Sequence, residues 1–130
     1  MMPVRVGLLN METLLKEELP LMLLFCAGYN SNSQRAKGYL AEIGEALDKK
    51  LLVGYVDIDY CPDIFYDYDV FEIPTVIMFE CGKPIMRHEG YIDPYKMRAL
   101  VRKFYGVLPD VSEFKLDPRS DLWLIMPDDL

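Results

Sequence analysis

VFEIPTVIMF, which occupies residues 70–79, is the stretch of this chain that decides its fold. Its last five residues, 75–79, are predicted to form a strand that follows Pro74 directly. A second strand is expected at residues 85–89, after the turn sequence Cys-Gly-Lys-Pro at 81–84. Two such runs joined by a short, glycine-containing turn are typical of a β-hairpin. We therefore predict an antiparallel pair of strands here.

Before this hairpin, strands and helices alternate. Residues 21–27 are a continuous apolar run, as expected for a central strand buried on both faces. Apolar residues then recur at helical spacing over 32–49, and the next strand is predicted at 52–58. Pro62 suits the first turn of a short helix that ends at Tyr68. These elements predict a β-α-β-α series that leads into the hairpin.

The two ends of the series are predicted from turn and cap residues. A short buried strand is expected at residues 4–9. Asn10 then caps a helix at 11–19, because its side-chain oxygen can accept an amide proton of the first turn, and Pro20 ends that helix. At the other end, Asp93 is expected to cap a final helix.

The predicted order β-α-β-α-β-α-β-β-α indicates one α/β domain at residues 1–105, with a central mixed sheet flanked by helices. Strands separated by helices are expected to be parallel neighbours, and the hairpin adds an antiparallel pair. Residues 106–130 form an acidic C-terminal extension with six acids and two bases. Its apolar segment at 122–126 predicts a contact element that packs on the domain or forms a homodimer.

Charge and cysteine content exclude several classes of function. The net charge of −7 argues against direct nucleic-acid contact and against anionic membranes, since both need a basic face. Three cysteines without a CxxC motif favour reduced thiols and a cytoplasmic location. His88 is the only histidine and has no ligand partner at metal-site spacing, so no metal or cofactor is expected. No segment has the length of a signal peptide or a membrane span.

Several segments resemble the thioredoxin superfamily, and they do so in the same order. Leu-Leu-Phe-Cys-Ala at 23–27 lies where thioredoxins have Val-Asp-Phe-Trp-Ala, and Val-Asp-Ile-Asp at 56–59 resembles their Val-Asp-Val-Asp strand end. Residues 70–79 resemble their Val-x-x-Ile-Pro-Thr segment, and Gly82 and Gly90 fall on the two glycines that follow it. The resemblance extends from about residue 4 to residue 104 and implies a thioredoxin-like fold.

The same comparison leaves the chain without the catalytic groups of that superfamily. The two cysteines of the superfamily fall on Asn30 and Ser33, and its buried aspartate falls on Leu24. Its lysine falls on Tyr55, and the tryptophan beside its motif falls on Cys26. A serine hydroxyl neither forms a disulfide nor loses its proton near neutral pH. The resemblance therefore implies a redox-inactive binding or scaffold module and favours a non-catalytic protein.

What the resemblance retains is a surface for binding an extended peptide. It implies a cis peptide bond before Pro74, an isomer that X-Pro bonds adopt at small cost, and it implies that Ile73 offers its backbone to the peptide. The expected partner is therefore a protein or peptide. The expected binding residues are Tyr29, Asn30, Ser31, Asn32, Ser33, Ile73, Pro74 and Tyr91.

Two segments near this surface have alternative interpretations. Residues 57–72 contain six acids, no base and five aromatic residues. They are either a solvated face with some rings packed inward or an acidic-aromatic patch suited to a basic partner segment. Residues 30–33 are either a polar turn that caps the following helix, which the capping preferences of Asn and Ser favour, or a contact surface for a partner.

Two rival functions stay open. In the first, Cys26 serves an atypical thiol-dependent oxidoreductase, although a cysteine that ends an apolar strand is more typically a small buried hydrophobe. In the second, Val-Asp-Ile at 56–58, Cys-Pro-Asp at 61–63 and Tyr68 resemble the Dim1-like spliceosomal proteins. That resemblance implies a component of ribonucleoprotein assembly, and the acidic charge then favours a role through protein contacts.

Overall fold

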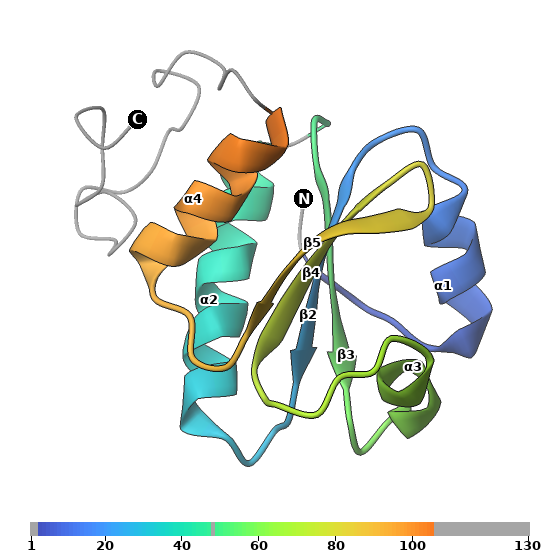
Figure 1. Cartoon of the computed structure of the whole chain (residues 1–130), viewed down its shortest axis with the longest axis vertical. Coiled ribbons are helices and arrows are strands. Elements are labelled where there is room, and N and C mark those ends of the chain that lie inside the picture. Colours follow the sequence, from blue (N-terminus) through green and yellow to red (C-terminus); the bar gives the residue numbers. More distant parts are fainter. Residues whose placement is uncertain (1–2, 48, 106–130) are drawn as a thin grey trace.

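The computed structural model describes residues 3–47 and 49–105. Its strands and helices follow the order that the sequence predicts (Figure 1), and the α/β architecture is confirmed. The C-terminal extension at 106–130 lies outside the described residues, so its expected packing and the homodimer stay predictions. The elements are β1 Val4–Arg5, α1 Leu8–Leu15, β2 Leu21–Cys26, α2 Ser31–Ala46, β3 Leu52–Asp57, α3 Pro62–Asp67, β4 Thr75–Glu80, β5 Lys83–Glu89 and α4 Pro94–Tyr105.

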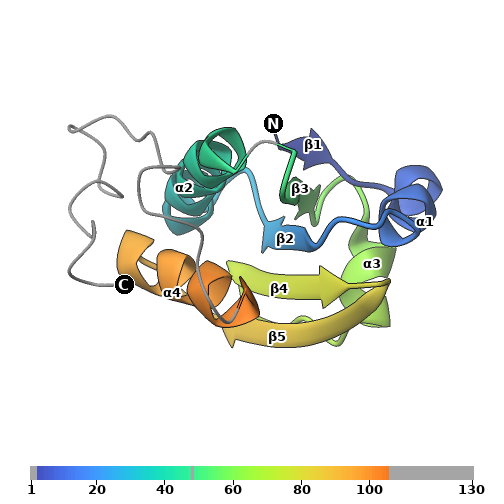
Figure 2. The same cartoon turned by 90° about the horizontal axis from the view of Figure 1, so that it is seen from above.

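The five strands form one mixed sheet in the order β1-β3-β2-β4-β5. β1 and β2 run parallel to β3, whereas β4 runs antiparallel to both β2 and β5. The helices lie on both faces of this sheet: α2 and α4 cover one face, and α1 and α3 cover the other (Figures 1 and 2). The predicted central mixed sheet flanked by helices is therefore confirmed.

The direction of β4 corrects the expectation that strands separated by a helix are parallel neighbours. Asp57 at the end of β3 lies opposite Cys26, and Thr75 at the start of β4 lies opposite Phe25, so β3 ends and β4 begins at the same end of the sheet. The six residues of α3 span only about 9 Å at 1.5 Å per residue, against about 20 Å for a six-residue strand. This helix is too short to return the chain to the opposite end, and β4 therefore runs back antiparallel to β2.

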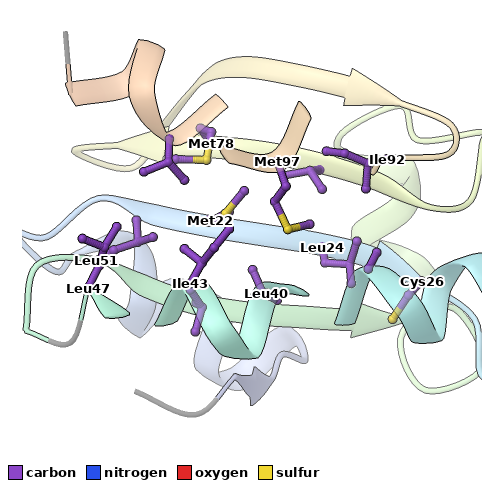
Figure 3. Close-up of a cluster of buried hydrophobic side chains, with 14 residues drawn as sticks. Met22, Leu24, Cys26, Leu40, Ile43, Leu47, Leu51, Met78, Ile92 and Met97 are labelled. Atoms are coloured by element: carbon purple, nitrogen blue, oxygen red, sulfur yellow. The ribbon is translucent and has the colours of Figure 1, made fainter. Parts of the chain in front are cut away.

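β2 is the centre of the hydrophobic core, and all six of its residues are buried. Successive side chains of a strand point to opposite faces, so this one strand supplies both core clusters. Met22, Leu24 and Cys26 pack with side chains of α2 and α4, as Figure 3 shows. Leu21, Leu23 and Phe25 pack on the other face with side chains of α1 and α3. The prediction of a central strand buried on both faces is confirmed.

The N-terminal elements differ from the predicted ones. β1 has two residues, and α1 begins at Leu8 with Gly7 as its N-cap, three residues before the predicted start. Asn10 lies inside the first turn, where its side chain accepts the Gly7 N–H at 2.7 Å and donates to the Arg5 carbonyl at 2.9 Å. The helix ends at Leu15, well before Pro20. The apolar run at 6–9 suits a strand or a helix, because a run of four residues does not define a period.

The closing hairpin is confirmed with a shorter turn than expected. β5 begins at Lys83, so that only Cys81 and Gly82 remain in the turn, both at positive φ (52° and 79°). Pro84 lies in β5 at the edge of the sheet, where its missing N–H breaks no pairing that the sheet requires. The predicted cap of the last helix is also confirmed, since Asp93 Oδ1 accepts the Lys96 N–H at 2.8 Å.

Candidate functional site

Four loops lie together at one end of the sheet. β2 and β3 end there, because Cys26 pairs with Asp57, and β4 begins there while β5 ends there, because Thr75 pairs with Glu89. The connections at this end are residues 27–30, 58–61, 68–74 and 90–93, and they lie at the lower end of the molecule in Figure 1. We call this region the proline end, since it contains Pro74. It brings every predicted binding residue to one end of the fold.

The turn at residues 30–33 is the N-terminal cap of α2, as the cap interpretation predicts. Asn30 Oδ1 accepts the Ser33 N–H at 2.8 Å. Ser33 is fully buried, and its Oγ accepts the Ala27 N–H at 3.2 Å. The two positions that hold cysteines in thioredoxins therefore satisfy backbone donors of the helix start and the preceding loop. Ser31 is exposed and Asn32 is half-buried, so only the middle of this turn faces outward.

The loop before β4 contains the Ile73–Pro74 peptide bond, which is cis, the isomer that the resemblance implies. Pro74 is buried and Ile73 is half-buried. Thr75 Oγ1 donates to the Glu72 carbonyl at 2.7 Å and so closes the turn that leads into β4. This hydrogen bond links the backbone on the two sides of Pro74 at the proline end.

Arg87 of β5 holds the other half of this loop. Its guanidinium donates to the carbonyl oxygens of Tyr68 and, at 3.2 Å, of Asp69, just after α3. It also pairs with Glu89 at 3.3 Å. An arginine fork that meets free carbonyl oxygens at a helix C-terminus satisfies acceptors that the helix cannot. Residues 70–74 are therefore anchored on both sides.

Large aromatic side chains are exposed on the proline end. Phe71 is 81% exposed, Tyr29 is 77% exposed and Tyr91 is 47% exposed. The loops that carry Phe71 and Tyr91 touch each other, because a Cβ added to Gly90 would lie 2.8 Å from Glu72 Oε2. Isolated exposed apolar residues are common on protein surfaces, but several together mark interaction sites. Tyr29, Phe71 and Tyr91 lie on three of the loops at the proline end, and we call them together the aromatic surface.

Phe71 was not among the binding residues predicted from the sequence. Residues 57–72 divide between the two interpretations: Phe65 is buried and Tyr68 half-buried, whereas Tyr60, Tyr66 and Phe71 are exposed. The position of Phe71, between the acids of this segment and Pro74, marks it as a candidate contact residue. The sequence pattern does not predict that Phe71 is exposed and Phe65 buried, since alternating acids and aromatics fit a buried ring as well as an exposed one.

Cys26 is the thiol nearest to the positions of the missing dithiol, and it is buried rather than activated. Its Sγ lies 3.4 Å from the Val56 carbonyl oxygen in the α2-side core. Burial, together with the nearby Asp57 carboxylate and against the opposing charge of Lys37, raises its pKa to about 11. Because the thiolate is the reactive species, these surroundings disfavour nucleophilic chemistry. The interpretation of Cys26 as a small buried hydrophobe is supported.

We expect Cys26 to react slowly with thiol reagents in the native protein. A pKa of about 11 in place of 9.0 leaves about 100-fold less thiolate at pH 8, and burial hinders access further. The variant Cys61→Ser/Cys81→Ser, which keeps only Cys26, should react with Ellman's reagent at least 100-fold more slowly than Cys26→Ser/Cys61→Ser, which keeps only the exposed Cys81. If the two variants react at equal rates in the native state, and also at equal rates in urea, Cys26 is accessible and activated.

The described residues do not place His88 in a group of metal ligands. His88 lies on the edge strand β5, half-buried, with Nε2 2.9 Å from the Tyr91 carbonyl oxygen. Within residues 3–47 and 49–105, no group of three or more His, Cys, Asp or Glu side chains has an arrangement that could bind a metal ion. None of the helices in that part of the chain has the length and hydropathy of a membrane span.

The fold and this site define a thioredoxin-fold protein without the dithiol. Residues 9–103 match the model of the thioredoxin family, and the chain belongs to this family. It is 34% identical over 79 residues to the chloroplastic thioredoxin Y of Oryza sativa subsp. japonica, a match over 61% of this chain and 47% of that protein. It is 28% identical over 98 residues to a thioredoxin of Mycobacterium tuberculosis, over 75% of this chain and 82% of that protein.

Other relatives differ in how much of their length is matched. A thioredoxin-like protein of Synechocystis is 29% identical over 79 residues, a match over 61% of this chain and 75% of that protein. A bifunctional thioredoxin reductase/thioredoxin of Mycobacterium leprae is matched over only 21% of its length. The chain thus spans less than half of the rice and M. leprae relatives.

Proposed function

We propose that this protein is a redox-inactive thioredoxin-fold module that binds a protein or peptide through its proline end. The observation that carries the proposal is the aromatic surface, where Phe71, Tyr29 and Tyr91 are exposed at the end of the sheet that holds the dithiol in thioredoxins. Tyr and Phe at a surface supply large apolar area for a partner at low cost in side-chain entropy. Binding is the chemistry that these side chains offer.

The neighbouring groups support binding rather than redox chemistry. Asn30 and Ser33 replace the thiols: Asn30 Oδ1 caps α2, and Ser33 Oγ accepts the Ala27 N–H. Leu24 stands at the position of the buried acid and is completely buried among apolar side chains. The hydrogen bonds of Thr75 and Arg87 hold the loop before β4 from both sides. Preorganisation of this kind lowers the entropic cost of association.

The experiment that tests the proposal compares two single truncations of exposed apolar side chains. We expect Phe71→Ala to weaken binding of an isolated partner at least tenfold, since truncation of a central aromatic side chain costs more than about 1.4 kcal/mol. Ile85→Ala is the matched control: Ile85 is 45% exposed but lies in β5, away from the proline end. Partners are first captured from extract with the full chain, then measured singly by calorimetry.

The control variant shows whether a captured protein binds at the aromatic surface or elsewhere. A partner whose affinity falls with Phe71→Ala and stays within twofold with Ile85→Ala binds at the aromatic surface. Partners that both variants retain equally, with both variants folded by circular dichroism, would contradict the proposal.

The rival function is a thiol-dependent oxidoreductase that uses Cys26, and the names of the relatives as thioredoxins favour testing it. The thiol-labelling experiment above and an insulin-reduction assay separate the two functions. We expect that the full chain, with dithiothreitol as the reductant, does not catalyse the reduction of insulin. Reduction above background that is lost in Cys26→Ser would establish the rival.

A further inference from the structure

We infer that the segment which binds the aromatic surface is an extended peptide whose apolar side chain is flanked by Lys or Arg. This inference rests on the proposed function and adds the chemistry of the partner. The loops at 27–30, 58–61, 68–74 and 90–93 together contain four acids and no Lys, Arg or His. The acids are Asp59, Asp69, Glu72 and Asp93. The charged side chains that these four loops contribute are thus all acidic.

Three of these carboxylates are exposed and available to a partner. Asp93 is engaged, because it caps α4 through the Lys96 N–H. Asp59, Asp69 and Glu72 are exposed, and among the described residues no Lys or Arg forms an ion pair with them. Two cations reach this end of the fold, but both are engaged elsewhere: Arg87 donates to the Tyr68 and Asp69 carbonyl oxygens and pairs with Glu89, and Arg5 lies over the ring of Tyr60. The carboxylates of Asp59, Asp69 and Glu72 therefore stay without an ion-pair partner among the described residues.

The placement of Glu72 and Asp69 around Phe71 sets the charge pattern that a partner meets. Glu72 follows Phe71 directly, and Asp69 precedes it by two positions in the same anchored loop. Both carboxylates are thus within two residues of the ring that a ligand side chain would cover, and exposed charges act over about one Debye length, roughly 8–10 Å. Charges arranged in this way attract a basic segment and repel an acidic one, and they affect association rate and specificity most strongly.

The aromatic rings are suited to the same ligand. Lys and Arg lay their apolar stems along rings while the cationic group meets the ring face. The protein itself makes this contact twice: Arg5 Cζ lies 4.0 Å from the centroid of Tyr60, and Lys37 Nζ lies 3.9 Å from the centroid of Tyr55. A basic and apolar segment thus satisfies both the rings and the carboxylates, whereas an acidic segment satisfies neither.

The test uses three capped nine-residue peptides that share a central Val-Phe-Val and carry Lys, Ser or Glu at the same four flanking positions. Each is titrated into the ¹⁵N-labelled full chain, and the amide shifts of residues 69–75 and 89–92 report the site. We expect the Lys peptide to bind about tenfold more tightly than the Ser peptide, and the Glu peptide to bind most weakly. The difference should shrink on going from 50 to 300 mM salt.

Two charge reversals show whether the preference is local. Glu72→Lys should remove most of the preference for the Lys peptide. Glu80→Lys changes the net charge equally, but Glu80 ends β4 at the opposite end of the sheet, and this variant should keep the preference. If both variants change the preference equally, the attraction reflects net charge and the inference is wrong.

Equal affinity of the three peptides at the site would overturn the inference and leave the proposed function standing. Absence of site shifts with every peptide would overturn both.

Discussion

Leu24→Asp is expected to destabilise this protein by about 3–5 kcal/mol near pH 4 and by several kcal/mol more at pH 8. Leu24 is 0% exposed, and the buried members of its cluster are apolar or thiol side chains. Loss of the leucine packing alone costs about 3–5 kcal/mol. A buried carboxyl group without a partner adds a second cost that depends on pH, because the charged form is disfavoured in these surroundings.

The sign of this pH dependence follows from the direction of the pKa shift. Burial raises the pKa of an aspartate introduced at position 24 above its unfolded value of about 3.9. Between the two pKa values the unfolded state has released a proton that the folded state retains, so stability falls as pH rises. The loss is about 1.4 kcal/mol per pH unit, or roughly 4 kcal/mol over three units. Added to the packing loss, this approaches the whole stability of a typical domain, about 5–15 kcal/mol.

Leu24→Asn is the matched control, because it has nearly the same shape as aspartate and does not ionise. Urea unfolding of both variants and the wild type between pH 4.5 and 7.5 measures the free energy of unfolding. The difference between Asp and Asn should grow steadily with pH. A constant difference would mean that position 24 accommodates a carboxylate, as the thioredoxin superfamily does at this position, and that the chain retains an environment for a buried acid. That result would weaken the view that the proton relay is replaced by core packing.

Much of the fold could be predicted because individual residues specify it locally. The unbroken apolar run at 21–27 indicates burial on both faces, and the structure places alternate side chains of β2 in two clusters. Asn30 has the side chain that a helix start requires, and it makes the predicted cap. These features depend on neighbouring residues, so sequence patterns contain them.

The parts that sequence patterns missed depend on contacts between distant residues. The direction of β4 depends on the length of α3 relative to the sheet. Helix α1 begins early, at Leu8, after an extended Gly7 whose N–H is bound by the Asn10 side chain. The candidate site was predicted in outline, since the resemblance located the residues around Pro74. The exposure of Phe71 was not predicted, because its loop makes its contacts with Arg87 and Gly90, which belong to other strands and turns.

Phe25→Ala is expected to have the largest effect among simple truncations, about 3–5 kcal/mol. Phe25 is fully buried in β2, and its ring packs edge-to-face against Phe65 at a centroid distance of 5.1 Å and against Tyr68 at 6.3 Å. Tyr68 in turn packs against Phe79 at 5.3 Å. The alanine variant leaves a cavity beside Phe65 and Tyr68, and both of these rings lose their contact with Phe25. At 4–8 °C per kcal/mol for a domain of this size, the melting temperature should fall by roughly 12–40 °C.

Phe71→Ala is the matched truncation at the aromatic surface, and it separates stability from binding. Phe71 is 81% exposed, so the same change should alter the free energy of unfolding by less than about 0.5 kcal/mol. Calorimetric scans of the two variants and the wild type give both values. If Phe71→Ala also costs several kcal/mol, Phe71 is part of the packing of the domain, and its exposure is no longer an argument for a partner. A large loss at Phe25 with almost none at Phe71 is the result that a binding surface requires, because a side chain that is reserved for a partner contributes little to the stability of the free domain.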